Sequence, residues 1–185
     1  MSVTTPRGGV DSIDVAPAER LDESDHVSGY SGVESPAVEA VPVREWQRVE
    51  GLYLAALVTD PDKFYLGSTD GQKRRDSLLN GIWVVARRGG EDIGLAWLGE
   101  RDDGWFVESV WVAPAHRREG VATTMMNHLI ALAKEMDLGC LSLWVVSHNE
   151  AAEELYTKRM GFVVAGQPKA TTDGREEQRY DLFLT

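Results

Sequence analysis

The residues best suited to chemistry surround a short turn, Arg117–Ala122. Before it, residues 106–112 are rich in β-branched and aromatic side chains, which indicates a strand. After it, apolar residues recur at helical spacing: Val121, Met125, Leu129, Leu132, Ala133 and Met136. A turn between a strand and a helix leaves backbone N–H groups unpaired at the positive end of the helix dipole. Arg117 and Arg118 add cationic donors, so the turn is predicted to bind a phosphate group.

A second block lies about thirty residues further along the chain and reads Asn149-x-x-Ala152-x-x-Leu155-Tyr156, followed by Gly161-Phe162. Asn149 is suited to start a helix, and Gly161 to end it. Apolar residues at i, i+3, i+4 and i+8 give the helix one apolar face. Taken alone, this pattern makes Tyr156 a core aromatic residue with its hydroxyl at the rim, and makes the turn an ordinary strand–helix connection without a ligand.

Together the two blocks resemble the GNAT superfamily of N-acetyltransferases, over about residues 40–185. The turn pattern Arg117-x-x-Gly120-x-Ala122 resembles the loop that binds the acyl-CoA pyrophosphate in that family. Ala122 stands where many members have glycine, and Glu119 places a negative charge in the turn. The resemblance implies acetyl-CoA as co-substrate, no metal, and the following cofactor-binding residues: Val110, Trp111, Val112, Arg117, Arg118, Glu119, Gly120, Val121, Ala122, Thr123, Asn149 and Tyr156.

The resemblance also implies a mechanism, in which a primary amine attacks the thioester directly, without a covalent acyl-enzyme. Asn149 would contact the pantetheine arm, and Tyr156 would be the general acid that protonates the departing thiolate. The developing oxyanion needs a backbone donor, which the N–H of Val110 or Val112 would supply. The alternatives are a protein of the same fold that binds acyl-CoA as a sensor or structural module, and an interaction domain that binds no CoA.

The general base is assigned to Glu108, on the strand that leads into the site. Regular strand alternation would place Glu108, Val110 and Val112 on one face. Glu108 would remove the amine proton directly or through a water, unless it is simply a solvated or ion-paired residue. His116, beside the turn, and His148, at a strand end, are weaker candidates for the same role.

The expected fold is α/β (α+β): a GNAT-type mixed, mostly antiparallel sheet of six to seven strands, flanked by helices, with parallel central strands splayed to hold acyl-CoA. Strands are expected at 37–43, 82–86, 93–98, 106–112, 140–147, 162–165 and 178–184. Helices are expected at 44–58, 120–136 and 149–160, with two short ones at 63–66 and 74–79. The strand–helix–strand unit in the middle must be a right-handed crossover between parallel strands.

Composition restricts the partners. The net charge of −11 argues against nucleic acid and against anionic membranes. Because the chain has no apolar run of membrane length, no signal core and a single cysteine, Cys140, we expect a cytoplasmic protein. An acidic chain with many tryptophans suits a cationic small-molecule or peptide amine as acceptor (Trp83, Trp97, Trp105, Trp111 and Trp144). Homodimers are common in the family, and the sequence does not decide this point.

Residues 1–36 differ from the rest of the chain, 37–185, which is the expected acetyltransferase domain. They are poor in apolar residues and rich in Ser, Gly, Pro, Asp and Glu. Such a composition cannot bury enough surface to offset the loss of chain entropy. We therefore expect an acidic, disordered tail.

Deleting residues 1–34 should leave the melting temperature and the affinity for acetyl-CoA nearly unchanged, because the tail is expected to make no packing contacts. Calorimetric unfolding and a titration with acetyl-CoA measure both quantities. A fall in melting temperature of more than about 5 °C would show that the tail packs on the domain.

Overall fold

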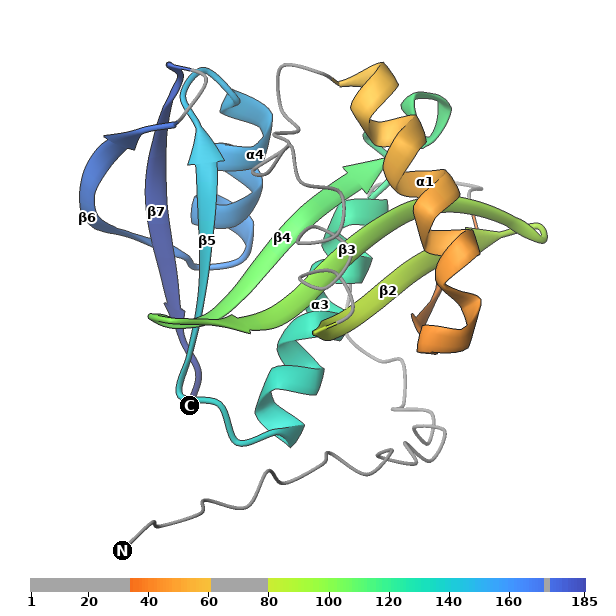
Figure 1. The fold of residues 1–185 in the computed structure, drawn as a ribbon, viewed down its shortest axis with the longest axis horizontal. Helices are drawn as coiled ribbons and strands as arrows, with labels where there is room; N and C mark the ends of the chain where they lie inside the picture. Colours follow the sequence, from red (N-terminus) through yellow and green to blue (C-terminus); the bar gives the residue numbers. More distant parts are fainter. Residues whose placement is uncertain (1–33, 61–79, 172–173) are drawn as a thin grey trace, which may run out of the picture. The chain divides into compact units, whose positions relative to one another are not determined.

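One seven-stranded sheet organises residues 34–60, 80–171 and 174–185, which are the residues that this computed structural model describes (Figure 1). The strands are β1 (Ala37–Val41), β2 (Gly81–Arg88), β3 (Glu91–Arg101), β4 (Gly104–Val112), β5 (Cys140–Val146), β6 (Val163–Ala170) and β7 (Glu176–Phe183). Their spatial order is β1-β2-β3-β4-β5-β7-β6. Every neighbouring pair is antiparallel except β4 and β5, which are parallel. The expected mixed, mostly antiparallel sheet is confirmed.

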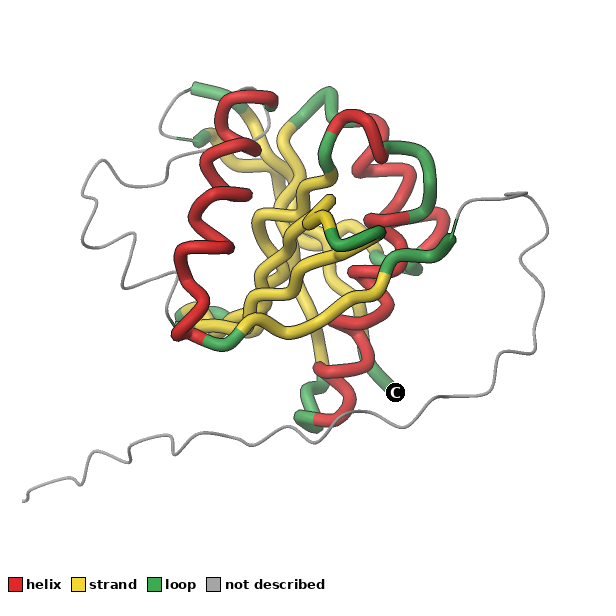
Figure 2. Tube along the Cα trace, turned by 90° about the vertical axis from the view of Figure 1, so that its right-hand side faces the viewer, coloured by secondary structure: helices red, strands yellow, loops and turns green. Residues whose placement is uncertain are grey.

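Helices cover both faces of this sheet (Figure 2). The helix α1 (Trp46–Thr59) lies on one face, which is called the α1 face below. The helix α3 (Val121–Glu135) and the short helix α4 (Glu150–Glu154) lie on the other, the α3 face. Three short helical segments complete the described structure: η1 (Val43–Glu45), η2 (Pro114–His116) and the π-helical η3 (Leu155–Arg159).

The two parallel strands diverge soon after they meet. Pairing between β4 and β5 has a single register position, Phe106 with Ser142. Beyond this point β4 and β5 run in different directions, as Figure 1 shows. The facing edges of the two strands therefore have backbone groups that the ladder does not pair. The expected splay is confirmed.

A bulge in β4 decides which way its side chains point. Between two register positions, β3 advances from Leu95 to Trp97 while β4 goes back from Trp111 to Glu108, so β4 holds one extra residue. Ser109 adopts a positive φ of 55° at this place. The expectation that Glu108 shares a face with Val110 and Val112 is therefore wrong, because the extra residue reverses the alternation.

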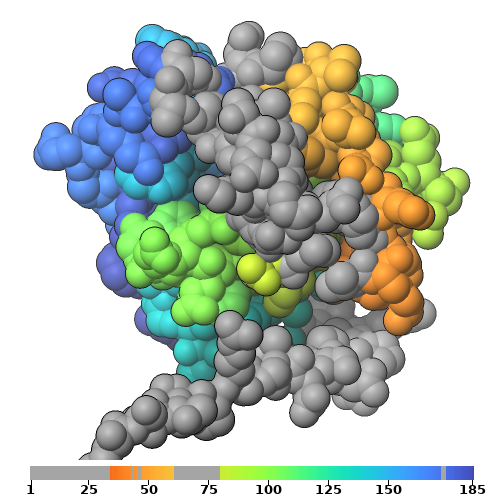
Figure 3. All heavy atoms as spheres, viewed as in Figure 1, coloured from red at the N-terminus to blue at the C-terminus, as the bar shows by residue number. Residues whose placement is uncertain are grey.

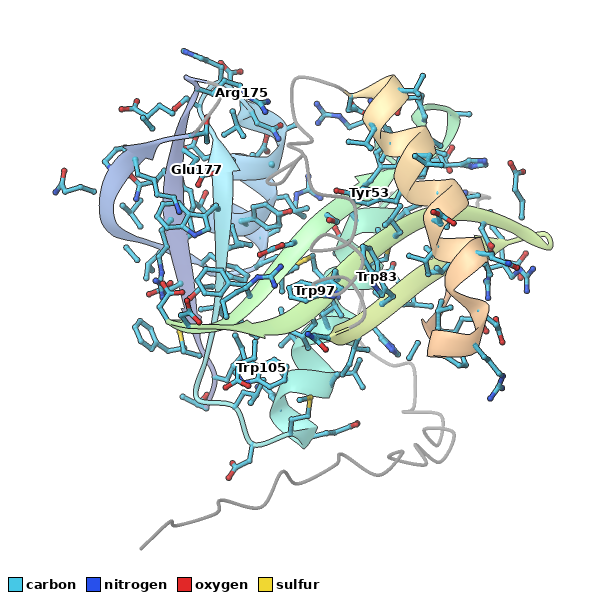
Figure 4. All side chains as sticks on the ribbon, in the orientation of Figure 1. Tyr53, Trp83, Trp97, Trp105, Arg175 and Glu177 are labelled. Carbon is cyan, nitrogen blue, oxygen red and sulfur yellow. The ribbon has the colours of Figure 1, made fainter. Side chains whose placement is uncertain are left out.

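The core divides between the two faces. On the α3 face, apolar residues of the sheet pack with Val121, Met125, Met126 and Leu129 of α3. On the α1 face, the strands contribute three tryptophans that pack against Val49, Tyr53 and Ala56 of α1: Trp83, Trp97 and Trp111. Figure 4 labels Tyr53 beside α1, with Trp83 and Trp97 over the neighbouring strands.

The indole of Trp97 lies flat on the backbone of its own sheet. Gly81 on β2 and Gly99 on β3 are register partners. A Cβ atom at Gly81 would lie 2.3 Å from Trp97 Nε1, and one at Gly99 would lie 2.0 Å from Trp97 Cζ2. Both positions therefore require glycine, since the buried ring, 1% exposed, has no room to move.

Most expected elements are present, with shifted ends. The hairpin strands β2 and β3 are longer than expected, and β6 extends to Ala170 rather than ending at residue 165. The last expected helix is α-helical only to Glu154 and continues as a π-helix. The expected helices at 63–66 and 74–79, and most of the expected tail at 1–36, lie outside the described residues.

Replacing Gly99 with alanine should destabilise the protein by roughly 1–3 kcal/mol, because the new methyl group overlaps the rigid Trp97 ring. Urea unfolding followed by tryptophan fluorescence measures the change. The matched control is Gly51→Ala in α1, where a Cβ meets no atom within 4 Å. The control should be neutral or stabilising by up to about 1 kcal/mol, and equal effects at both glycines would contradict the packing described here.

Candidate active site

The turn that precedes α3 presents free donors. Gly120 is the N-cap of α3 with φ 81°, and a Cβ built on it meets no atom within 4 Å. The first backbone bond of the helix runs from the N–H of Thr124 to the carbonyl of Gly120, at 3.0 Å. The N–H groups of Val121, Ala122 and Thr123 therefore have no carbonyl in the helix to donate to. Open space above these groups, at the positive end of a fifteen-residue helix, fits a phosphate group.

Arg117 anchors this turn instead of facing outward. Its Nε donates to the carbonyl of Val112 at 3.0 Å, and its Nη2 donates to Asp60 at the end of α1. The indole N–H of Trp111 donates to Thr59 Oγ1 at 3.0 Å and to Asp60 Oδ2 at 3.1 Å. Burial alone would raise the pKa of the Asp60 carboxyl, but hydrogen bonds from Arg117, Thr59 and Trp111 lower it below its usual value. Asp60 thus stays ionised and ties the turn to α1.

Glu119 points away from the helix N-terminus toward β2. Its carboxylate accepts a hydrogen bond from Arg88 Nη1 and lies 3.5 Å from His116 Nδ1. The hydrogen bond from Arg88 lowers the pKa of Glu119. The Nε and Nη2 atoms of Arg88 are buried without a partner among the described residues. The negative charge in the turn is therefore neutralised by Arg88, a residue that no sequence pattern singled out.

Arg118 is the cation of the turn that remains available. It is exposed and adopts a positive φ of 65°. It makes no hydrogen bond or ion pair within the described part of the chain. Of the two arginines expected at the phosphate, Arg118 is thus placed to reach an anion, while Arg117 holds the backbone.

Tyr156 lies in the core of the α3 face, at the start of the π-helix. It is 7% exposed, and its ring contacts Phe162 edge-on at 5.8 Å between centroids. Within the described residues its hydroxyl has no hydrogen-bond partner. Burial raises the pKa of this hydroxyl, so it remains protonated. The wider π-helical turn, closed by a bond from the N–H of Met160 to the carbonyl of Leu155 at 3.1 Å, is a feature common at functional sites.

Asn149 occupies the expected N-cap position, but its side chain makes no cap hydrogen bond. Its backbone carbonyl instead accepts from the N–H groups of Ala152 and Glu153, each at 3.0 Å. The half-buried side-chain amide is left available for a ligand. His148, one residue earlier, is exposed and has a positive φ of 70°; it lies in the turn that follows β5.

Glu108 lies on the α1 face and is ion-paired. Its two carboxylate oxygens accept from Arg101, at 3.0 Å from Nε and 2.8 Å from Nη2. The guanidinium of Arg101 also stacks on the Trp97 ring, 4.2 Å from its centroid. The side chain of Glu108 is 40% exposed. The ion-paired alternative for this residue is therefore present in the structure.

The remaining cofactor-binding candidates can offer mainly backbone groups to a ligand, because their side chains are packed within the protein. The side chains of Val110 and Val112 pack on the α3 core, and Val121 is 2% exposed. Ala122 and Thr123 are half-buried in the first turn of α3. Sequence reasoning missed three side chains that pair with candidate residues: Asp60, Arg88 and Arg101. The partners of Asp60 and Arg88 are 57 and 31 residues away in the chain, whereas Arg101 meets Glu108 across the turn between β3 and β4.

The five tryptophans that were expected to suit a cationic acceptor differ in burial and in what they contact. Trp83, Trp97 and Trp111 are between 1% and 6% exposed, so they form core on the α1 face and not an open aromatic surface. Trp105 packs against the α3 core. Trp144 on β5 is half-exposed and carries a cation on its ring, the ammonium of Lys169 at 3.6 Å from the centroid.

Two further properties concern only the described residues. No group of three or more His, Cys, Asp or Glu side chains among them is arranged to hold a metal ion. None of their helices is both long and apolar enough to cross a membrane.

Comparisons with known proteins agree with this geometry. The streptothricin acetyltransferase of Streptomyces lavendulae is 37% identical over 80 residues, which span 43% of this chain and 42% of that protein. A putative acetyltransferase from Salmonella typhimurium, solved with its cofactor acetyl-CoA, superposes with a TM-score of 0.66 at 19% identity. That match covers 82% of this chain and 95% of the other. A putative streptothricin acetyltransferase from Bacillus anthracis, solved with acetyl coenzyme A, gives 0.52 at 22% identity over 57% and 64% of the two chains.

A family model supplies the assignment. The family model described as "Acetyltransferase (GNAT) family" matches residues 43–162, which include the turn before α3, the splayed strands and the segment that carries Tyr156. The solved structures share the same fold at low identity. The chain belongs to the GNAT acetyltransferase family.

Proposed function

We propose that this protein is an N-acetyltransferase that transfers the acetyl group of acetyl-CoA to a primary amine by direct attack on the thioester. The observation that carries the proposal is the splay of β4 and β5, which pair at Phe106 and Ser142 only. The splay leaves unpaired backbone on β4 between the helix N-terminus at Gly120 and the buried hydroxyl of Tyr156. A cofactor with a pyrophosphate, an amide-bearing arm and a thioester needs donors arranged in this way.

The pyrophosphate of acetyl-CoA fits the N–H groups of Val121, Ala122 and Thr123, with Arg118 adding charge. The pantetheine arm carries amide groups, and these can pair with the open edge of β4 as a neighbouring strand would. The side-chain amide of Asn149 is available to the same arm. In this arrangement Arg117 and Glu119 act on the cofactor indirectly, since their side chains are engaged by Asp60 and Arg88.

Acyl transfer then requires three proton and charge movements. A primary amine with a lysine-like pKa is only about 0.1% neutral at pH 7, so its proton must be removed. The oxyanion that forms on the thioester carbonyl needs a backbone donor, for which the N–H of Val110 or Val112 is the candidate. The thiolate that leaves needs a proton, which Tyr156 holds because burial raises its pKa. The protons balance as follows: the ammonium gives one proton to the base before it attacks, and the nitrogen of the tetrahedral intermediate gives up a second. CoA leaves as a thiol with the proton of Tyr156, and the second proton from the nitrogen makes good that loss, so one proton is released overall.

Glu108 remains our candidate for the base, with a constraint that only the structure supplies. Both carboxylate oxygens accept hydrogen bonds from Arg101. Protonation of the carboxylate would weaken this ion pair, so proton uptake is coupled to movement of Arg101 or passes through a water. His116 is a weaker candidate, because it faces Glu119 in the turn.

The acceptor is proposed to be a cationic amine. Net charge −11 favours the approach of cations. The similarity to the streptothricin acetyltransferase of Streptomyces lavendulae supports streptothricin as one candidate, although the match spans only 42% of that protein's length. The cytoplasmic location and a homodimeric state stay predictions.

The ion pair of Glu108 favours one alternative, a protein that binds acyl-CoA without turnover. Release of free thiol from acetyl-CoA over a panel of amines separates the two functions. The transferase should release thiol with at least one amine, in proportion to acetylated product. Tight acetyl-CoA binding without thiol release across the panel would establish the sensor instead.

Replacing Gly120 with glutamate should abolish acetyl-CoA binding, because the carboxylate would occupy the space above the N–H groups of α3. Gly120→Ala is the matched control, since it imposes the same strain at φ 81° without a charge. Calorimetric titration measures the affinity, and circular dichroism checks the fold. The alanine variant should retain most of the affinity. A folded glutamate variant with the affinity of the parent would remove the basis of the phosphate site.

Replacing Tyr156 with phenylalanine should lower kcat by about 10²-fold while acetyl-CoA binding is roughly retained, because a proton donor is lost and little volume changes. The loss should shrink with an acyl donor whose thiol is a better leaving group. Steady-state and single-turnover rates check this. Full kcat in the variant, with chemistry shown to limit the rate, would mean that Tyr156 is a core residue only.

A further inference from the structure

The side chain of Lys169 is bound within the protein in the way that an alkylammonium ligand would be. The ammonium of Lys169 on β6 lies 3.6 Å from the centroid of the Trp144 ring and 3.2 Å from Glu177 Oε1. An aromatic face with a carboxylate beside it is a typical binding site for an alkylammonium group. We call Trp144 and Glu177 the cation clamp.

The cation clamp lies on β5 and on β7, which pairs with β5, and its side chains are on the α1 face of the sheet. Glu177 pairs in register with Val146 of β5 and Lys169 of β6, and Trp144 pairs with Arg179. Arg179 also contacts Ser142 and stacks on the Phe106 ring at 5.1 Å, at the point where the strands diverge. Figure 4 shows Glu177 beside β5, and residues of β6 and β7 are at the surface in Figure 3. The clamp therefore opens on the same face as Glu108.

This face is also the one that an acceptor must use. Tyr156 and α3 pack on the opposite face, where apolar side chains fill the space. A cofactor bound at Gly120 and Tyr156 thus comes from the α3 side. An amine that attacks the thioester carbonyl from the opposite side then comes from the α1 face, on which the clamp lies.

The ion pair of Lys169 is weak enough for the ammonium to leave the clamp. Its side chain is 52% exposed, and exposed ion pairs contribute little to stability. Glu177 is only 18% exposed, and Lys169 is its one ion-pair partner among the described residues. An irregular stretch precedes Lys169, since β6 and β7 lose register between Ala165 and Lys169. A cation from solution can therefore take the place of the lysine, and the carboxylate stays paired.

We propose that the cation clamp binds a second cationic group of the acceptor, distinct from the amine that is acetylated, and that Lys169 occupies the clamp until the acceptor arrives. The substrate class is then a diamine or polyamine-bearing molecule rather than a monoamine. This proposal rests on the proposed acetyl transfer, and it adds a specificity site that the transfer itself does not require.

The kinetic test uses linear α,ω-diamines of increasing length, each compared with the monoamine of the same length. At the best length the diamine should have a kcat/KM at least about tenfold higher, which exceeds the factor of two expected from having two amines. Glu177→Gln should reduce the preference to that factor of two through KM. Lys169→Met should raise the ratio of kcat/KM for diamines to kcat/KM for monoamines. Glu176→Gln is the matched control on the neighbouring residue of β7 and should change nothing.

A binding test does not depend on turnover. The diamine of best length is titrated calorimetrically into Lys169→Met and into the double variant Lys169→Met with Glu177→Gln, both saturated with CoA. The first should bind about tenfold tighter. Equal affinities, or a kcat/KM for diamines no more than about twice that for monoamines in an active enzyme, would overturn the clamp while the transferase stands. Tighter diamine binding with no acetyl transfer to any amine would refute the proposed function and leave the clamp intact.

Discussion

The single parallel pairing of Phe106 with Ser142 is the constraint on which the site depends. Arg179 stabilises this point through four interactions: it donates hydrogen bonds to Ser142, Asp181 and Asp103, and its guanidinium stacks on the Phe106 ring. Beyond it the strands separate, and the bulge at Ser109 turns β4 further. Backbone donors and acceptors that a regular sheet would pair are thereby left for a ligand. The proposed cofactor site is thus the gap between the two central strands of the sheet.

For an acidic chain to bind a polyanion such as acetyl-CoA, the carboxylates near the proposed phosphate site have to be paired with cations. The net charge is −11, yet Asp60 and Glu119, the acidic residues beside the phosphate turn, are each paired with an arginine. In the proposed complex, the dipole of α3 and Arg118, which has no ion pair within the described part of the chain, act on the phosphate over a short range. The acidic net charge is then left to attract the cationic acceptor that we propose.

The sequence predicted the parts that depend on neighbours in the chain. Gly120 before an apolar helical repeat indicated the start of α3, and Pro114 the end of β4. Regular alternation failed at Glu108, because one extra residue in a strand is invisible in a pattern of apolar and polar types. Asn149 was placed correctly, but its side chain does not cap the helix. The π-helical turn at Tyr156 also carries no local signal that separates it from an α-helix.

By itself, the sequence determined the order of strands and helices, the turn between β4 and α3 and the family resemblance, because these follow from periodicity and backbone requirements over a few residues. Only the tertiary structure decided which side chains of the candidate site are engaged by other residues and which are available to a ligand. Arg117 turned out to anchor Asp60, 57 residues away, and Lys169 to lie on Trp144. Such pairs depend on how separate elements pack, and side-chain partners distant in sequence leave no pattern in one sequence.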